Sequence, residues 1–194
     1  PYFRLGVTIE NSHMVKAYRI FPPKDYEKWA QICEHIVRHY NEGWANCFNL
    51  GITYWEIWNE PDLDEDDCPD KRTWGGTKAQ FFDLYEITAK HLKACFPHLK
   101  IGGYASCGFY TIGPDGKYDP NYPRPRYHYY YEFFHDFMKY IAAEETKAPL
   151  EFFSWHHYQD HTTVARYARY VRQALDSYGF TEAESILDEW SPGP

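Results

Sequence analysis

Short apolar runs alternate along the chain with longer segments in which apolar residues recur at helical spacing. The runs are interpreted as strands, and they cover residues 3–9, 52–59, 99–105, 150–158 and 185–190. The segments between them predict helices from Pro22-Pro23 to Tyr40, from Thr77 to Phe96, around 130–141 and from Thr162 to Tyr178. Strands that alternate with helices in this way form βαβ units and a parallel sheet.

No internal repeat, charge block or Ser/Gly linker divides the sequence, so we predict one α/β domain over residues 1–194. An open doubly wound sheet and part of a closed (β/α)8 TIM barrel both fit this order of elements. A full barrel takes about 250 residues, and five strand–helix units are too few to close one. The chain also begins directly on a predicted strand and ends four residues after another. We therefore expect an incomplete segment of a TIM barrel.

Composition and charge narrow the classes of partner. A net charge of -8 disfavours nucleic acid and anionic membranes, and no apolar run approaches the roughly 20 residues of a membrane span. No signal peptide is visible and the five cysteines form no C-x-x-C pair, which together favour reduced thiols and a cytoplasmic location. The aromatic content of 20% suits core packing and also sugar binding.

Two glutamates stand at predicted strand ends beside tryptophans, and ligands gather at the carboxyl ends of parallel strands. Glu60 follows Trp58 and precedes Pro61, and Glu189 precedes Trp190. Either glutamate alone is more simply interpreted as a solvated loop carboxylate. Glycoside hydrolysis, however, needs one carboxylic acid and one carboxylate on opposite sides of the sugar. Their joint placement therefore predicts Glu60 and Glu189 as a catalytic pair.

The stretch Trp55–Asp62 resembles the acid/base strand of the large retaining glycosidase clan built on (β/α)8 barrels. The stretches Pro22–Trp29 and Val37–Tyr40 resemble glycoside hydrolase family 39 in particular, a family of β-xylosidases and α-L-iduronidases. Ile186–Trp190 is similar to the nucleophile strand of that family. The resemblance runs through most of the chain and is weakest between Gly108 and Arg126.

The resemblance implies that Glu60 is the acid/base at the end of barrel strand 4 and Glu189 the nucleophile at the end of strand 7. The five strands would then be strands 3 to 7, with strands 1, 2 and 8 missing from this chain. It also implies that Asn59 binds the sugar 2-OH. Strict alternation would point Asn59 and Glu60 to opposite faces, so we expect a bulge or sharp twist there.

The predicted strand between the two glutamates ends in His156-His157-Tyr158. We expect one histidine or the tyrosine to orient Glu189, and we count all three as substrate-binding candidates. Adjacent histidines point to opposite sides of a strand, so at least one packs elsewhere and the pair makes a poor ligand set. We therefore predict no metal and no cofactor.

Three further residues are candidates for contact with a sugar: Trp190, Trp74 and His13. For the two tryptophans a place in the core is nearly as plausible, and Trp44 is assigned to the core. Glu56 lies four residues before Glu60 on the same face of the strand, and we predict a buried, paired carboxylate with a structural role.

These observations favour a retaining exo-acting β-xylosidase on plant oligosaccharides, with a small carbohydrate as its partner and oligomerisation left open. The predicted strand ends carry no Arg or Lys, which disfavours an iduronide substrate. One alternative is another activity of the clan, such as an arabinofuranosidase, endoglycanase or β-glucosidase. Two others are a non-catalytic carbohydrate-binding barrel and a fragment that cannot fold alone because its barrel edges are open.

Overall fold

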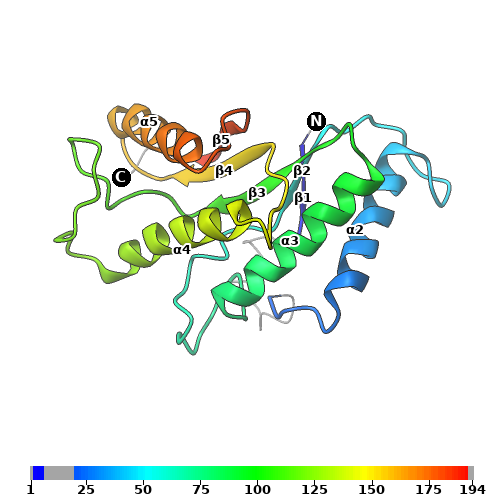
Figure 1. Ribbon diagram of the computed structural model, residues 1–194, viewed down its shortest axis with the longest axis horizontal. Coiled ribbons are helices and arrows are strands. Elements are labelled where there is room, and N and C mark those ends of the chain that lie inside the picture. The colour runs from blue at the N-terminus through cyan, green and yellow to red at the C-terminus, as the bar shows by residue number, and fades with distance from the viewer. Residues whose placement is uncertain (1, 7–19, 192–194) are drawn as a thin grey trace.

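The computed structural model describes residues 2–6 and 20–191. Five strands form one sheet: β1 (Tyr2–Leu5), β2 (Tyr54–Ile57), β3 (Lys100–Ser106), β4 (Phe152–His157) and β5 (Glu184–Trp190). Four described helices connect them: α2 (Tyr26–Asn41), α3 (Lys78–Cys95), α4 (Pro125–Ala142) and α5 (His161–Ser177). Neighbouring strands are parallel and follow the order of the chain, and the helices cover one face of the sheet (Figure 1). The predicted alternation of strands and helices is confirmed.

Local signals set where the helices begin. Thr77 and Gln80 form the predicted capping box, in which each side chain bonds the backbone N–H of the other residue. The helix α2 starts later than the prolines at 22 and 23 suggest. The Asp25 carboxylate accepts the Lys28 N–H at 3.0 Å, so Asp25 is the N-cap and the prolines precede the helix.

Contacts across the concave face show that the sheet is curved. Adjacent strands lie about 4.8 Å apart, so a flat sheet would separate β1 from β5 by about 19 Å. Instead, Arg4 Nη2 on β1 lies 2.8 Å from the Asp188 carboxylate on β5. The Tyr54 hydroxyl on β2 likewise donates to Glu184 on β5 at 2.9 Å. The five strands are therefore an arc of a barrel, as the sequence predicts.

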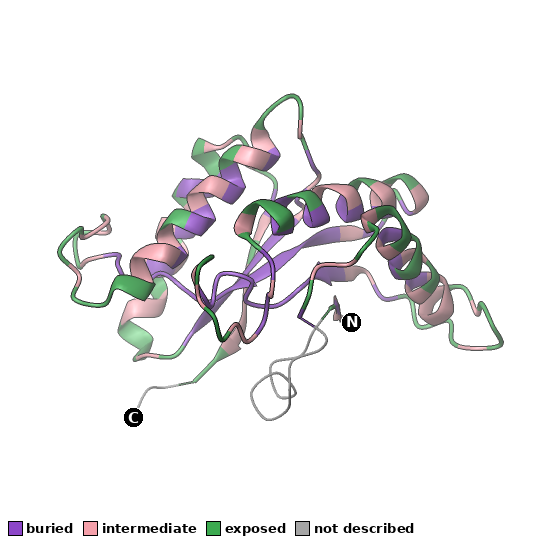
Figure 2. Cartoon of the chain, turned by 90° about the horizontal axis from the view of Figure 1, so that it is seen from below, coloured by how far each residue is buried: buried purple, intermediate pink, exposed green. Residues whose placement is uncertain are grey.

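The convex face of the arc and the helices enclose an aromatic core. Tyr104 on β3 packs against Phe81 of α3 and against Phe133 and Phe137 of α4, with ring centroids 4.9–5.7 Å apart. Figure 2 shows the buried residues on the strands and on the sides of the helices that face them. Trp44 was expected in this core, but that expectation is wrong. Its side chain is 49% exposed and stacks on His35 at the surface.

The structure also bears on the predictions about the cysteines and about membrane spans. All five cysteines lie in the described residues and are free thiols. Among the described helices, none has both the length and the apolar character needed to cross a bilayer. The strands β2 and β4 are shorter than their apolar runs, whereas β3 has the predicted length and β5 is one residue longer. Residues 7–9 of the first run lie outside the described part of the chain.

Candidate active site at the carboxyl ends of the strands

The exit of β2 is distorted where Asn59 and Glu60 were expected to break the alternation. Trp58 and Glu60 take positive φ values of 73° and 47°. Backbone hydrogen bonds hold this turn on both sides, from Trp58 N–H to the Leu5 carbonyl at 2.7 Å and from Glu60 N–H to the Ala105 carbonyl at 3.1 Å. Both Asn59 and Glu60 are buried as a result.

Glu60 is anchored from the neighbouring strand β4. The residue is 4% exposed, and its Oε1 lies 2.8 Å from Nδ1 of the buried His156. The other oxygen, Oε2, is buried and finds no hydrogen-bond partner among the described residues. A buried carboxylate oxygen without a partner is unfavourable in the folded protein alone, so it marks a position where a proton or a ligand can be placed.

Glu189 is held by two side chains from different strands. The Tyr158 hydroxyl donates to its Oε2 at 2.6 Å, and Arg4 Nη1 donates to its Oε1 at 3.1 Å. The side chain stays 25% exposed. The carboxylate is therefore fixed in orientation while remaining open to a ligand.

The two glutamates face each other across a short gap. Glu60, His156 and Glu189 each offer one atom of the kind that binds metals, and these three atoms lie within 4.8 Å of one another. A carboxylate oxygen of Glu60 therefore lies within 4.8 Å of one of Glu189. Retaining glycosidases place their two carboxyl groups about 5–5.5 Å apart, whereas inverting ones need about 6.5–9.5 Å to admit a water molecule.

His156 carries the positive charge between these acids. Burial lowers its pKa, but Asp188 and Glu60 outweigh burial and raise the pKa to about 10. Its Nε2 lies 3.6 Å from Asp188 and 3.5 Å from Glu189, which are ion-pair distances. An imidazolium has no lone pair for a metal, so Glu60, His156 and Glu189 are better suited to proton chemistry than to metal binding.

Arg4 joins the acids of the concave face, and the sequence reasoning missed it. Its guanidinium bonds the fully buried Glu56 through Nε, Asp188 through Nη2 and Glu189 through Nη1. Glu56 is thus the buried, paired carboxylate that was predicted. Burial and the charge of Asp188 raise the pKa of Glu56, against the effect of Arg4. The sequence offered little signal for this contact, because Arg4 stands opposite Glu56 through the β1–β2 register, which becomes visible only in the structure.

Of three other candidates, Asn59 lies beside Glu60, whereas His157 and Trp74 pack elsewhere. The side-chain amide of Asn59 is buried beside Glu60 and has no hydrogen-bond partner among the described residues. His157 faces away from the glutamates, with Nε2 against the Asp160 carbonyl at 3.0 Å and its ring against Tyr167. Trp74 is buried in the core, where its ring packs on Trp58 with centroids 5.1 Å apart.

The last two candidates are Trp190, which lies near the end of the described residues, and His13. Trp190 ends β5 with its side chain 52% exposed, next in the chain to Glu189. His13 lies outside the described residues.

A cavity of about 210 Å³ opens beside Glu60. Tyr158 and two arginines, Arg72 and Arg126, contribute to its wall together with the tyrosines Tyr110, Tyr127 and Tyr130. The absence of Arg and Lys from the predicted strand ends therefore does not mean that this cavity lacks basic groups. Both arginines come from loop or helix-start positions outside the strand ends, which is why inspection of the strand ends overlooked them.

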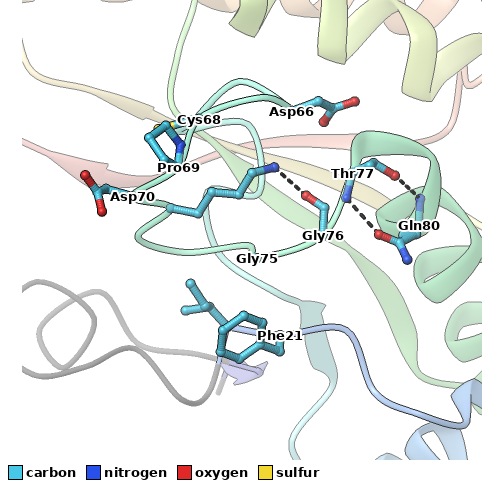
Figure 3. Close-up of a pocket in the computed structure, with 11 residues that line it drawn as sticks. Phe21, Asp66, Cys68, Pro69, Asp70, Gly75, Gly76, Thr77 and Gln80 are labelled. Carbon is cyan, nitrogen blue, oxygen red and sulfur yellow. Dashed lines mark hydrogen bonds between the residues drawn. The ribbon is translucent and has the colours of Figure 1, made fainter.

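A second, larger cavity of about 560 Å³ lies between the start of α3 and the residues before α2. Its wall includes Phe21, Asp66, Asp70 and Gln80 (Figure 3). Lys71 crosses part of it to bond the Gly76 carbonyl at 2.6 Å. Neither Glu60 nor Glu189 lines this cavity, so its size alone does not make it the reaction site.

Comparisons with known proteins show what the chain is similar to. The family model described as glycosyl hydrolases family 39 matches residues 8–191. A β-xylosidase of Geobacillus stearothermophilus is 30% identical over 158 residues, which are 81% of this chain and 25% of that protein. The chain thus spans about a quarter of the length of that relative.

Solved structures show the same likeness. A glucosidase from Croceicoccus marinus matches with 31% identity and a TM-score of 0.69, over 88% of this chain and 31% of that one. A family 39 β-xylosidase from Caulobacter crescentus matches with 22% identity and a TM-score of 0.64, over 98% of this chain and 37% of that one. The second match supports the barrel fold alone.

Proposed function

The chain belongs to glycosyl hydrolase family 39, and from that premise we propose that it forms the catalytic face of a retaining glycosidase, with Glu189 as nucleophile and Glu60 as acid/base. One observation carries this proposal. Carboxylate oxygens of the two glutamates lie within 4.8 Å of each other at the carboxyl ends of the strands, a close approach that favours the short carboxyl separation of retaining enzymes.

The proposed reaction has two displacements. In the first, the Glu189 carboxylate attacks the anomeric carbon while Glu60 gives its proton to the departing glycosidic oxygen, so that a glycosyl ester forms as the C–O bond breaks. In the second, Glu60 takes a proton from water, the water oxygen attacks the anomeric carbon, and the ester bond to Glu189 breaks. The protons balance over the cycle, and no cofactor is required.

The surrounding residues have distinct proposed roles. Tyr158 and Arg4 hold the Glu189 carboxylate in the orientation for attack. His156 donates to Glu60 and keeps its carboxyl group toward the gap. In this proposal the amide of Asn59, which is buried, bonds the sugar 2-OH, an interaction that strengthens in the transition state. Trp190, exposed beside Glu189, offers an apolar ring for stacking on a sugar.

We propose a β-xyloside as the substrate, because the curated relative at 30% identity is described as a β-xylosidase. A β-glucoside is the second candidate, since the solved structure at 31% identity is described as a glucosidase. The two sugars differ by one hydroxymethyl group at C5, so discrimination depends on the space around that carbon.

Hydrolysis of a panel of aryl glycosides tests both the proposed substrate and the proposed retaining mechanism. The panel contains the 4-nitrophenyl β-xyloside, β-glucoside and α-arabinofuranoside, and proton NMR follows the anomer released first. We expect the highest kcat/KM on the β-xyloside, with the β-anomer appearing first. Preference for the glucoside would change the substrate only, whereas initial release of the α-anomer from a β-glycoside would overturn the retaining mechanism. Absence of hydrolysis with measurable sugar binding would favour a carbohydrate-binding barrel instead.

A further inference from the structure

A second cluster of ligand-type side chains lies in the outer helical layer, between α2 and α3. Glu34 on α2 faces His91 and Cys95 on α3, and the carboxylate, imidazole and thiol offer atoms within 4.8 Å of one another. His91 Nε2 lies 2.7 Å from Glu34 Oε2 and 3.8 Å from Cys95 Sγ. All three side chains are half-buried. The proposed glycosidase reaction uses none of them.

The donor types and their spacing fit a zinc ion. Zinc binds thiolate sulfur at about 2.3 Å and imidazole nitrogen at about 2.0–2.1 Å in tetrahedral geometry, which places nitrogen and sulfur about 3.6 Å apart. The distance between His91 Nε2 and Cys95 Sγ is 3.8 Å. His91 and Cys95 are four residues apart on α3, so both project from the same face of the helix. Zinc–oxygen bonds of about 2.0–2.2 Å place nitrogen and oxygen about 3.4 Å apart, so the Glu34 carboxylate has to move by about 0.7 Å from its 2.7 Å contact with His91 to share a metal.

The carboxylate is already oriented for this role. Arg38 Nε binds Glu34 Oε1 at 2.8 Å, which leaves Oε2 directed at His91. The same guanidinium is also held by Glu42 at 2.6 Å, so part of its charge is balanced away from the cluster. Hydrogen bonds from Arg38 and His91 lower the pKa of Glu34, which keeps it ionised. Second partners that fix a ligand in this way are typical of metal sites.

We propose that Glu34, His91 and Cys95 form a structural site for a zinc ion that links α2 to α3. Water completes the coordination. Binding breaks the S–H bond of Cys95, whose proton passes to solvent as the thiolate binds the metal. Because the thiolate is the ligand, uptake of the metal releases a proton and strengthens with pH.

The position in the fold assigns a structural role to this site. His91 and Cys95 lie in the last part of α3, which leads through a short turn into the start of β3. The cluster therefore lies toward the amino ends of the strands, whereas the two glutamates of the proposed reaction lie at the carboxyl ends. In barrels of this kind the amino end contributes stability and the carboxyl end contributes catalysis. In Figure 1, α2 and α3 lie side by side, and their contact is what the ion would fasten.

Titration of the metal-free protein with Co²⁺ tests this site directly, because a thiolate ligand to cobalt gives a charge-transfer band in the near ultraviolet. We expect one band that saturates at one ion per chain, competition by Zn²⁺ and a higher unfolding temperature with Zn²⁺. Cys95→Ser should abolish the band, and His91→Gln and Glu34→Gln should each weaken binding by more than about tenfold. The matched control is Cys68→Ser, a half-buried cysteine at the larger cavity, which should keep both the band and the temperature shift.

The outcomes separate cleanly. Absence of a saturable band in the wild-type protein, or a band that survives in Cys95→Ser, would overturn the proposal. Should Cys95→Ser fail to fold, His91→Gln and Glu34→Gln provide the test instead. Unchanged cobalt affinity in these two variants would overturn the proposal. The result does not depend on glycosidase activity, so this inference and the proposed function can fail independently.

Discussion

Arg4→Met is the substitution whose effect on stability follows most directly from the concave face of the sheet. Arg4 bonds Glu56, which is fully buried, and also Asp188 and Glu189. Methionine has a similar reach but no charge, so the change removes the cation with little loss of packing. Glu56 is then left as a buried carboxylate without its counter-ion.

Removal of one partner from a buried ion pair destabilises a protein by about 3–5 kcal/mol, and we expect a loss in that range near neutral pH. The loss should depend on pH, because the pKa of Glu56 is raised by burial and by Asp188 even with Arg4 present. Without Arg4 the pKa rises further, so Glu56 in the folded variant takes up a proton as the pH falls. The penalty should therefore be complete above the pKa of Glu56 in the folded variant and shrink as the pH falls toward its unfolded value of about 4.3.

Urea unfolding of the wild type and the variant at about pH 7.5 and about pH 5 measures this difference. Lys90→Met is the matched control, because it removes a cation from the exposed pair with Glu86, an i,i+4 pair of a kind that contributes about 0.3–0.5 kcal/mol. A loss below about 1 kcal/mol for Arg4→Met at the higher pH would refute the reasoning. So would a loss that stays constant on acidification.

Three further predictions concern single residues. Glu60→Gln should abolish hydrolysis of alkyl glycosides yet retain part of the rate on a 4-nitrophenyl glycoside, because that leaving group needs less protonation. Equal losses of rate on the two substrates in steady-state assays would contradict the acid role of Glu60. The pKa of His156 is raised to about 10, so its contribution to stability is present below about pH 6.5 and lost as the pH rises through about 10. His156→Gln should flatten that decline in urea unfolding, and an unchanged slope would argue against the ion pairs. Burial raises the pKa of Asp62 to about 7, so the wild type should lose stability as the pH rises from about 4 to about 7. Asp62→Asn should remove this dependence in thermal unfolding, and a variant that keeps it would show that another group titrates.

The order of elements and the place of the two glutamates could be predicted because each depends on local sequence. Apolar periodicity marks the strands, Thr77 and Gln80 mark a helix start, and the strand-end rule places Glu60 and Glu189 at one edge of the sheet. The distortion at Asn59 could also be foreseen, since both it and Glu60 needed to face the same side.

The remaining features depend on tertiary structure. Arg4 reaches Glu189 only because the sheet curves until β1 faces β5, and a run of four residues carries no signal of that curvature. Arg72 and Arg126 reach the cavity beside Glu60 from irregular or exposed segments whose path the sequence does not specify. Trp44 follows the end of α2 in a turn with positive φ at Ala45 and Asn46, so helical periodicity no longer applies to it.

Covalent trapping of the intermediate tests the central claim most directly. A 2-deoxy-2-fluoro-β-xyloside with an activated leaving group forms the glycosyl ester but slows its hydrolysis, and mass spectrometry of the digested protein locates the label. Our account predicts one sugar per chain, in ester linkage to Glu189, with Glu60 unmodified. A label on Glu60 or on another residue, or release of free fluoro-sugar with no labelled peptide, would contradict it.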